Sequence, residues 1–171
     1  MSSRSLKKPR IIRSYRAIIP TISLAGRPEF LLFQRATNVH YPGFWECLGA
    51  TPEDGNKVKA SWILPKGGLS EGGIRITRIF EEIYRHQRPI EEWPGSRCND
   101  YDIYESLYFL VDCATIKRID LCPQHRGFGW FPLPAIICLK KIVRESTWEA
   151  FKRLTSIDLS KYQPQINHRH H

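Results

Sequence analysis

The segment from residue 62 to residue 73 constrains the fold of this chain most, because it divides the sequence into two differently patterned parts. Residues 62–64 are a brief apolar run typical of a strand. Pro65 and two glycine pairs interrupt the chain directly afterwards. Apolar residues then recur at the i, i+3, i+4, i+7 spacing of one helix face, at Ile76, Ile79, Phe80 and Ile83. We therefore predict a short strand, a glycine-rich loop and an amphipathic helix that ends at Pro89.

Apolar runs on both sides of this segment indicate the fold class. Strands are predicted within residues 15–24, 29–35, 104–111 and 128–131. A last helix is predicted to begin near Ser146, because Ser146 and Glu149 have the S-x-x-E form of a capping box. The order strands, helix, strands, helix predicts an α/β (α+β) sandwich with a mixed β-sheet between helices.

Length and charge limit the classes of protein that this chain can be. Its 171 residues correspond to one domain, and no apolar run reaches the length of a transmembrane helix. Lys and Arg total 26 against 17 Asp and Glu, so the net charge of +9 favours a polyanionic partner such as RNA. The acid-free, Ser/Arg-rich start is typical of a mitochondrial targeting segment and also of a basic arm. We predict that arm over residues 1–12, one domain over 13–159 and a polar tail over 160–171.

The cysteines and histidines show no ligand spacing. No pair of cysteines has C-x-x-C spacing, which predicts neither a zinc ribbon nor a disulfide framework for Cys47, Cys98, Cys113, Cys122 and Cys138. We expect reduced, mostly buried thiols in a reducing compartment. His40, His86 and His125 are isolated, and each is expected to be a surface or hydrogen-bonded side chain. Trp62 and Trp130 are expected in the core.

The run Trp62-Ile63-Leu64-Pro65-Lys66-Gly67-Gly68-Leu69 resembles the entry to a Nudix box. The Nudix signature is G-x5-E-x7-R-E-U-x-E-E-x-G-U, with U aliphatic, and it forms a loop, a helix and a second loop. The likeness covers about residues 13–155. The Trp-x-Leu-Pro-Lys-Gly-Gly run is most similar to the branch that acts on diphosphoinositol polyphosphates and dinucleoside polyphosphates. The resemblance implies a Nudix-type α/β/α sandwich whose helix carboxylates hold Mg²⁺ for hydrolysis of a pyrophosphate.

Counting from Gly67 as the opening glycine yields a degenerate box. In this register Gly73 stands at the first glutamate of the signature and Glu81 at the arginine. Glu82 stands at the next glutamate, and Arg85 and His86 stand at the two paired glutamates. On a helix Glu82, Arg85 and His86 would share one face, and an arginine cannot ligate Mg²⁺. Aligning Glu81 and Glu82 with the paired glutamates does not restore the signature. We therefore predict no metal site and no catalytic residue, or Glu82 in both roles if the protein is active.

Basic residues near this segment suggest a different chemistry. Lys66 and the backbone N–H groups of Gly67 and Gly68 could hold a phosphate without metal, and Arg78 and Arg85 follow within reach along the chain. The alternative interpretation of the same residues is a solvated basic helix face.

Three functions remain open from the sequence. We favour a catalytically inactive Nudix-fold protein that serves as a structural or adaptor subunit of a larger assembly. Its partners would be other proteins and RNA, as in a mitochondrial ribosome or respiratory complex, and its location mitochondrial or otherwise cytoplasmic. The second is a Mg²⁺-dependent hydrolase of nucleoside-diphosphate-linked or diphosphoinositol substrates, with further ligands such as Glu53, Glu91 or Glu92. The third is a metal-free RNA- or nucleotide-binding module.

Overall fold

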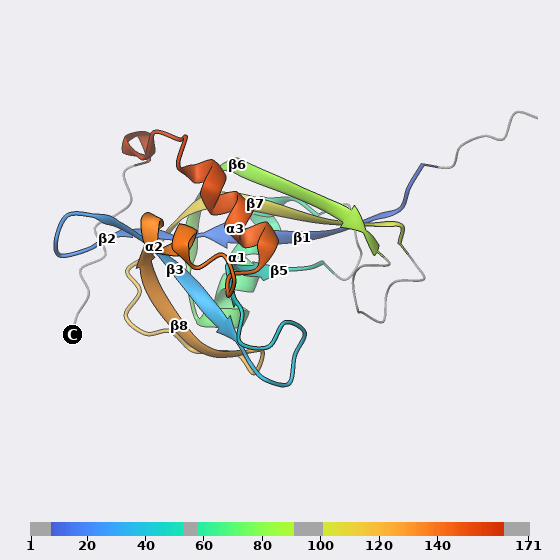
Figure 1. Ribbon diagram of the computed structural model, residues 1–171, viewed down its shortest axis with the longest axis horizontal. Coiled ribbons are helices and arrows are strands. Elements are labelled where there is room, and N and C mark those ends of the chain that lie inside the picture. The colour runs from blue at the N-terminus through green and yellow to red at the C-terminus, as the bar shows by residue number, and fades with distance from the viewer. Residues whose placement is uncertain (1–7, 53–57, 91–100, 163–171) are drawn as a thin grey trace, which may run out of the picture.

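Two four-stranded sheets form the centre of the protein (Figure 1). A computed structural model describes residues 8–52, 58–90 and 101–162. The first sheet has the order β5-β1-β7-β6. In the second, β8 pairs along one edge of β3, and β2 and β4 pair with successive parts of its other edge. The strands are β1 (Ile11–Ile18), β2 (Pro20–Ile22), β3 (Pro28–Arg35), β4 (Trp45–Glu46), β5 (Leu48–Ala50), β6 (Ile76–Pro89), β7 (Ile103–Cys113) and β8 (His125–Pro132).

The first sheet is mixed, as predicted. Strand β1 runs parallel to β7, while β5 and β6 run antiparallel to their neighbours. Strand β2 pairs antiparallel with β3, so the segments predicted as strands within 15–24 and 29–35 are neighbours. Glu53, Glu91 and Glu92, named above as possible further ligands, lie outside the described residues. The domain limits proposed from the sequence remain a prediction.

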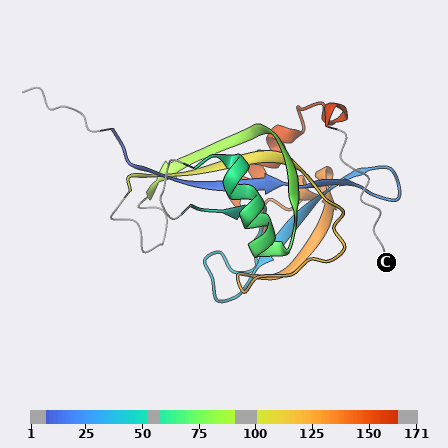
Figure 2. The same cartoon turned by 180° about the vertical axis from the view of Figure 1, so that it is seen from behind.

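Helices cover the first sheet on both of its faces, which gives the predicted α/β/α sandwich (Figures 1 and 2). Helix α1 (Ala60–Gly72) packs on one face through Ile63 and Leu64, which join a core with Tyr15, Leu107 and Val111. Helix α3 (Glu145–Leu154) covers the other face, and α2 (Leu133–Cys138) packs beside α3 and against β3 and β8. There Trp148, Phe151 and Leu154 are buried in one cluster with Tyr108 and Ile18. A short 3-10 turn, η2 (Leu159–Lys161), follows.

The helix predicted over residues 76–83 is wrong, because this segment is strand β6. The pairing of β6 with β7 is irregular between Ile76 and Arg78, between Ile79 and Glu82, and between Glu82 and Tyr84. Each β-bulge inserts an unpaired residue and shifts which side chains face inward. When the alternation of inward and outward side chains is interrupted in this way, the apolar residues of a strand have the i, i+3, i+4, i+7 spacing of a helix.

The strand predicted over residues 62–64 is also wrong, since this segment belongs to helix α1. A proline within the helix and the glycine pair at 67–68 made the segment look like a loop. Gly67 and Gly68 are instead contact points, because a Cβ at Gly67 would come within 2.8 Å of the Ala50 side chain and one at Gly68 within 2.5 Å of the Ile74 carbonyl oxygen. Close packing against β5 and the start of β6 therefore determines the helix. Trp62, expected in the core, is 52% exposed.

The last helix begins where predicted, but without the predicted capping box. Arg144 is its N-cap and no side chain caps it. The Ser146 hydroxyl instead lies 2.8 Å from the buried Tyr108 hydroxyl, which ties α3 to β7. Cys47 and Cys113 are buried and free, as expected, whereas Cys138 is exposed. Within the described ranges, no helix is long and apolar enough to cross a membrane.

Candidate functional site

A cavity of about 340 Å³ opens where the two sheets meet helix α1. Three arginines from distant parts of the chain line it: Arg16 on β1, Arg35 at the end of β3, and Arg144 before α3. We call this space the arginine cavity. The rest of its wall comprises Ser14, His40, Tyr41, Glu46, Gly49, Ala50, Thr51, Glu71, Tyr104 and Gln124.

Glu46 is a buried carboxylate that contacts all three arginines of the cavity wall. Its Oε1 accepts from Arg35 Nη1 at 2.5 Å and lies 3.3 Å from His125 Nε2. Its Oε2 accepts from Arg144 Nη1 at 2.7 Å and faces Arg16 Nη1 at 3.6 Å. A single buried carboxylate therefore holds three guanidinium groups together.

Gly49 makes room for Arg16. The two residues are opposite one another in the β1–β5 pairing, and a Cβ at Gly49 would come within 2.5 Å of Arg16 Cδ. Without that Cβ the arginine stem crosses β5, so that Nη1 reaches the Cys47 carbonyl oxygen at 3.4 Å and the carboxylate of Glu46. The glycine is therefore needed for this placement of the guanidinium.

The electrostatics of the cavity wall favour negative charge. Burial alone would raise the pKa of Glu46, but Arg16, His125, Arg144 and Arg35 outweigh it and hold that pKa well below its usual range. Burial likewise acts to raise the pKa of Tyr104, and the charge of Arg16 reverses the effect, so that this pKa is lowered. A buried phenol whose anionic form is favoured indicates a positive local potential.

Glu71 is the second carboxylate of the cavity. It lies near the C-terminal end of α1, and its Oε2 accepts from the backbone N–H of Gly49 at 3.2 Å. Burial raises its pKa, although the charge of Arg16 and the Gly49 hydrogen bond act in the opposite direction.

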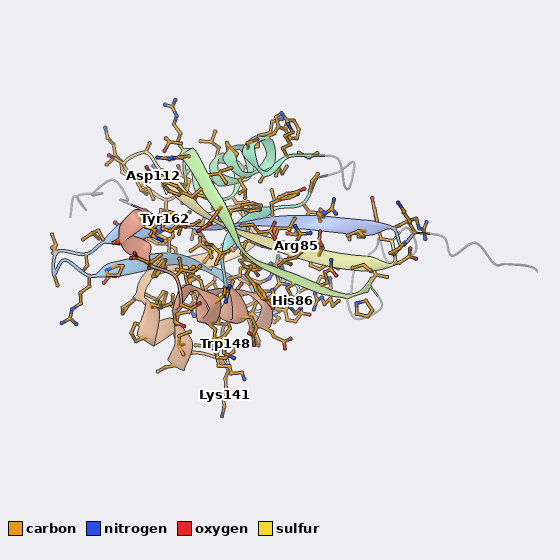
Figure 3. The ribbon with its side chains drawn as sticks, turned by 90° about the horizontal axis from the view of Figure 1, so that it is seen from above. Arg85, His86, Asp112, Lys141, Trp148 and Tyr162 are labelled. Carbon is orange, nitrogen blue, oxygen red and sulfur yellow. The ribbon has the colours of Figure 1, made fainter. Side chains whose placement is uncertain are left out.

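The residues chosen from the predicted box lie elsewhere, because β6 is a strand. Glu82 accepts from Arg85 Nε and Nη2 at 2.9 and 2.8 Å, and the pair lines an open depression with Arg13, outside the arginine cavity. Neighbouring residues of a strand point to opposite faces, so His86 lies on the α3 side of β6 and Arg85 on the α1 side (Figure 3). Glu81 is exposed. The structure therefore does not bring Glu82, Arg85 and His86 together on one helix face.

The predicted phosphate cradle is not assembled either. The Lys66 ammonium lies 3.4 Å from the centre of the Trp62 ring on the outer side of α1, and Gly67 and Gly68 are buried helix residues that pack against β5 and β6. Arg78 stacks on Phe80. Gly73 ends α1 in the left-handed backbone conformation, with φ of 65°. The residues Lys66, Gly67, Gly68, Arg78 and Arg85 are all absent from the wall of the arginine cavity.

The sequence analysis missed the residues that do converge. Arg16, Arg35 and Glu46 are charged positions inside otherwise apolar strands, in the runs YRAII, LLFQR and WECL. Such burial of charge requires partners, so these positions carried a usable signal. His125, treated as an isolated histidine, proves to be buried and in contact with Glu46.

Solved structures show which fold this arrangement belongs to. The chain is similar to the MutT protein of Methanosarcina mazei Go1, with 19% identity, 88% of this chain and 96% of that one covered, and a TM-score of 0.66. The chain has the Nudix hydrolase fold. It is also similar to an Ap4A hydrolase of C. elegans (16% identity, 84% and 95% covered, TM-score 0.60). The Nudix domain of Shewanella oneidensis NrtR, solved with ADP ribose, matches at 11% identity, 91% and 92% coverage and a TM-score of 0.62. Neither a protein-family model nor a curated protein matches the sequence.

Within the Nudix fold, helix α1 is the helix onto which the signature can be placed. The closing Gly-aliphatic pair of the signature then coincides with Gly73 and Ile74, which directly follow α1. The paired glutamates fall on Ser70 and Glu71, and the preceding glutamate falls on Gly67. In this register Glu71 alone keeps a carboxylate, and it is the one that faces the arginine cavity.

The donor set of the cavity does not fit the Mg²⁺ that the Nudix signature implies. Mg²⁺ requires oxygen ligands in a near-octahedral arrangement. Both oxygens of Glu46 already accept from arginine, which leaves the carboxylate of Glu71 and places Arg16 beside it. Over residues 8–52, 58–90 and 101–162, no three His, Cys, Asp or Glu side chains form a group able to hold a metal ion.

Proposed function

We propose that this protein binds a phosphorylated ligand in the arginine cavity without using a metal ion. The observation that carries the proposal is the convergence of Arg16, Arg35 and Arg144 on one cavity. A guanidinium presents a planar fork of donors that suits phosphate oxygens, and it cannot lose its charge. Three arginines face two carboxylates, Glu46 and Glu71, so the wall keeps a net positive charge towards an anion that enters the cavity.

The size of the cavity fits a small molecule. About 340 Å³ lies near the lower end of the range for ligand pockets and accommodates a phosphorylated metabolite better than a nucleic-acid duplex. The Nudix fold supports this proposal as well, since one protein of similar fold is called an Ap4A hydrolase and another was solved with ADP ribose.

Calorimetric titration with inorganic tripolyphosphate in EDTA tests the proposal. We expect binding without metal, weakened about tenfold by Arg35→Lys, which keeps the charge but removes the fork. Lys66→Gln is the matched control, because Lys66 stacks on Trp62 outside the cavity. Wild-type affinity in Arg35→Lys together with a loss in Lys66→Gln would restore the cradle expected from the sequence and refute the cavity.

The hydrolase hypothesis has its own test. Incubation with Mg²⁺ and Ap4A or ADP ribose, with phosphorus NMR as the readout, is expected to leave both compounds intact. Mg²⁺-dependent cleavage that Glu71→Gln abolishes would show that the protein is an enzyme. The structural-subunit role, RNA binding and mitochondrial location remain predictions, and nothing in the described geometry favours them over a soluble ligand.

A further inference from the structure

Arg88 on β6 lies directly behind the wall of the arginine cavity. It is opposite Tyr104 in the β6–β7 pairing, and its guanidinium stacks over the Tyr104 ring at 5.4 Å. Its Nη1 donates to the Tyr41 hydroxyl at 3.1 Å. Tyr41 and Tyr104 are both cavity residues, so Arg88 contacts the site although it does not line the cavity itself.

The other edge of the Arg88 guanidinium makes no hydrogen bond within the described part of the chain. Nε and Nη2 are buried from solvent, and neither makes a hydrogen bond to any residue that the structure describes. These two nitrogens lie on the same edge of the planar group, the edge that donates in parallel to two oxygens of a phosphate or carboxylate. Two unused parallel donors that are buried on a half-buried cation are unfavourable in the protein alone, and an oxyanion would satisfy both.

Arg88 lines a smaller pocket next to the cavity. Its volume is about 150 Å³, and its wall comprises Tyr41, Phe44, His86, Arg88, Arg144, Glu145 and Ser146. Tyr41 and Arg144 belong to both walls, so the two spaces adjoin. The smaller space lies below the usual range of ligand pockets and suits one chemical group instead of a whole ligand. Arg88 and Arg144 together outweigh the charge of Glu145.

Tyr41 is held in an unusual conformation between these two spaces. Its φ is 57°, the left-handed region that residues other than glycine seldom adopt. Its ring lies 4.9 Å from the Arg144 guanidinium carbon and packs edge-on against Phe44. The backbone strain is maintained by contacts with residues of both pockets, and strain of this kind is found most often at binding sites.

We propose that Arg88 binds a second phosphate group of the ligand held in the arginine cavity. This rests on the proposed function and gives it a substrate class: compounds with at least two phosphate groups, one placed at Arg16, Arg35 and Arg144 and the other at Arg88. Tyr41 separates the two groups and fixes the distance between them.

Titration of tripolyphosphate against Arg88 variants tests this second subsite. Arg88→Lys keeps the charge but loses the parallel donors, and we expect its affinity for tripolyphosphate to fall about tenfold. Tyr41→Phe removes only the acceptor of Nη1, and we expect a loss below about threefold, because the free edge remains. Arg78→Lys is the control on the same strand, since Arg78 stacks on Phe80 away from both pockets.

Each outcome decides between the two proposals. Wild-type affinity in Arg88→Lys, with weakened binding in Arg35→Lys, refutes the subsite and leaves the proposed function intact. A loss in Tyr41→Phe as large as that in Arg88→Lys means that Arg88 acts through the loop, and also refutes it. Failure of the wild-type protein to bind tripolyphosphate refutes both proposals. Tighter binding of citrate than of tripolyphosphate refutes the assignment to phosphate.

The Tm of the protein without ligand distinguishes a ligand-binding role of Arg88 from a purely structural role, because the two roles predict opposite changes in Tm. Arg88→Met removes a half-buried cation whose Nε and Nη2 have no hydrogen-bond partner in the described residues. We expect a Tm equal to that of the wild type or raised by about 2 °C, because the unsatisfied charge disappears. A fall of about 4 °C or more would show that Arg88 stabilises the fold and would overturn its assignment as a ligand-binding residue.

Discussion

Glu46 is the residue whose loss would most disturb the site and the fold together. It is buried and faces three arginines and a histidine. Glu46→Gln leaves the guanidinium groups without a counter-charge, and removing one partner of a buried ionic network costs about 3–5 kcal/mol of unfolding free energy. Urea denaturation at neutral pH measures this loss. The control is Asp102→Asn, whose exposed pair with Arg10 is screened by solvent and should leave the unfolding free energy nearly unchanged.

The same residue predicts how stability depends on pH. The pKa of Glu46 is lowered in the folded protein, so the unfolded chain binds the proton more readily. Its contribution to stability is therefore fully present above the unfolded pKa, near 4.5, and is lost as the pH falls through and below that value. Glu46→Gln should flatten the acid limb of the curve of unfolding free energy against pH. An acid limb as steep as that of the wild type would contradict this assignment.

Helix α1 depends on the absence of side chains at its contact with the sheet. A Cβ at Gly68 would come within 2.5 Å of the Ile74 carbonyl oxygen, a backbone atom that cannot move aside easily. Gly68→Ala should therefore lower the unfolding free energy by about 1–3 kcal/mol, even though alanine favours helices. Denaturant melts measure the change, and Ser70→Ala, on the exposed side of the same helix, should be neutral or slightly stabilising.

This substitution also separates two interpretations of the glycine pair. If Gly67 and Gly68 serve packing alone, Gly68→Ala destabilises the protein without changing the affinity for tripolyphosphate under conditions where the protein remains folded. A loss of affinity with unchanged stability would support the phosphate cradle inferred from the sequence.

Assembly is a property of the whole molecule. The net charge of +9 is compatible with a polyanionic partner, but the arginines of the cavity face inward, towards a space of small-molecule size. If the protein is a subunit of a large particle, the endogenous protein will sediment with that particle in a gentle lysate. Sedimentation as a species of about 20 kDa, the mass of one chain, would exclude a stable subunit role and leave ligand binding as the function to pursue.

Much of the fold followed from local patterns in the sequence. The strands at 29–35, 104–111 and 128–131 were predicted because apolar, β-branched and aromatic runs between turn residues fit one kind of element. Helix α3 was predicted because its apolar residues keep an uninterrupted helical period, although the expected cap was not formed. The resemblance to the Nudix signature gave the right fold but the wrong helix.

The errors arose where tertiary contacts override local preference. The bulges of β6 shift its side chains until a strand has the spacing of a helix, and only pairing with β7 reveals them. Helix α1 forms despite Pro65 and its glycines because those glycines permit close contact with β5.

Local sequence patterns predicted the class of fold, the excess of positive charge and the positions of charged residues within apolar strands, because these depend on neighbouring residues along the chain. Which of those charges meet depends on how the sheets and helices pack. Arg16, Arg35, Glu46 and Arg144 are far apart in sequence, and only the pairing of two sheets brings them to one cavity. Buried charges are stable only when they are paired with opposite charges, so the site depends on packing and not on any single motif.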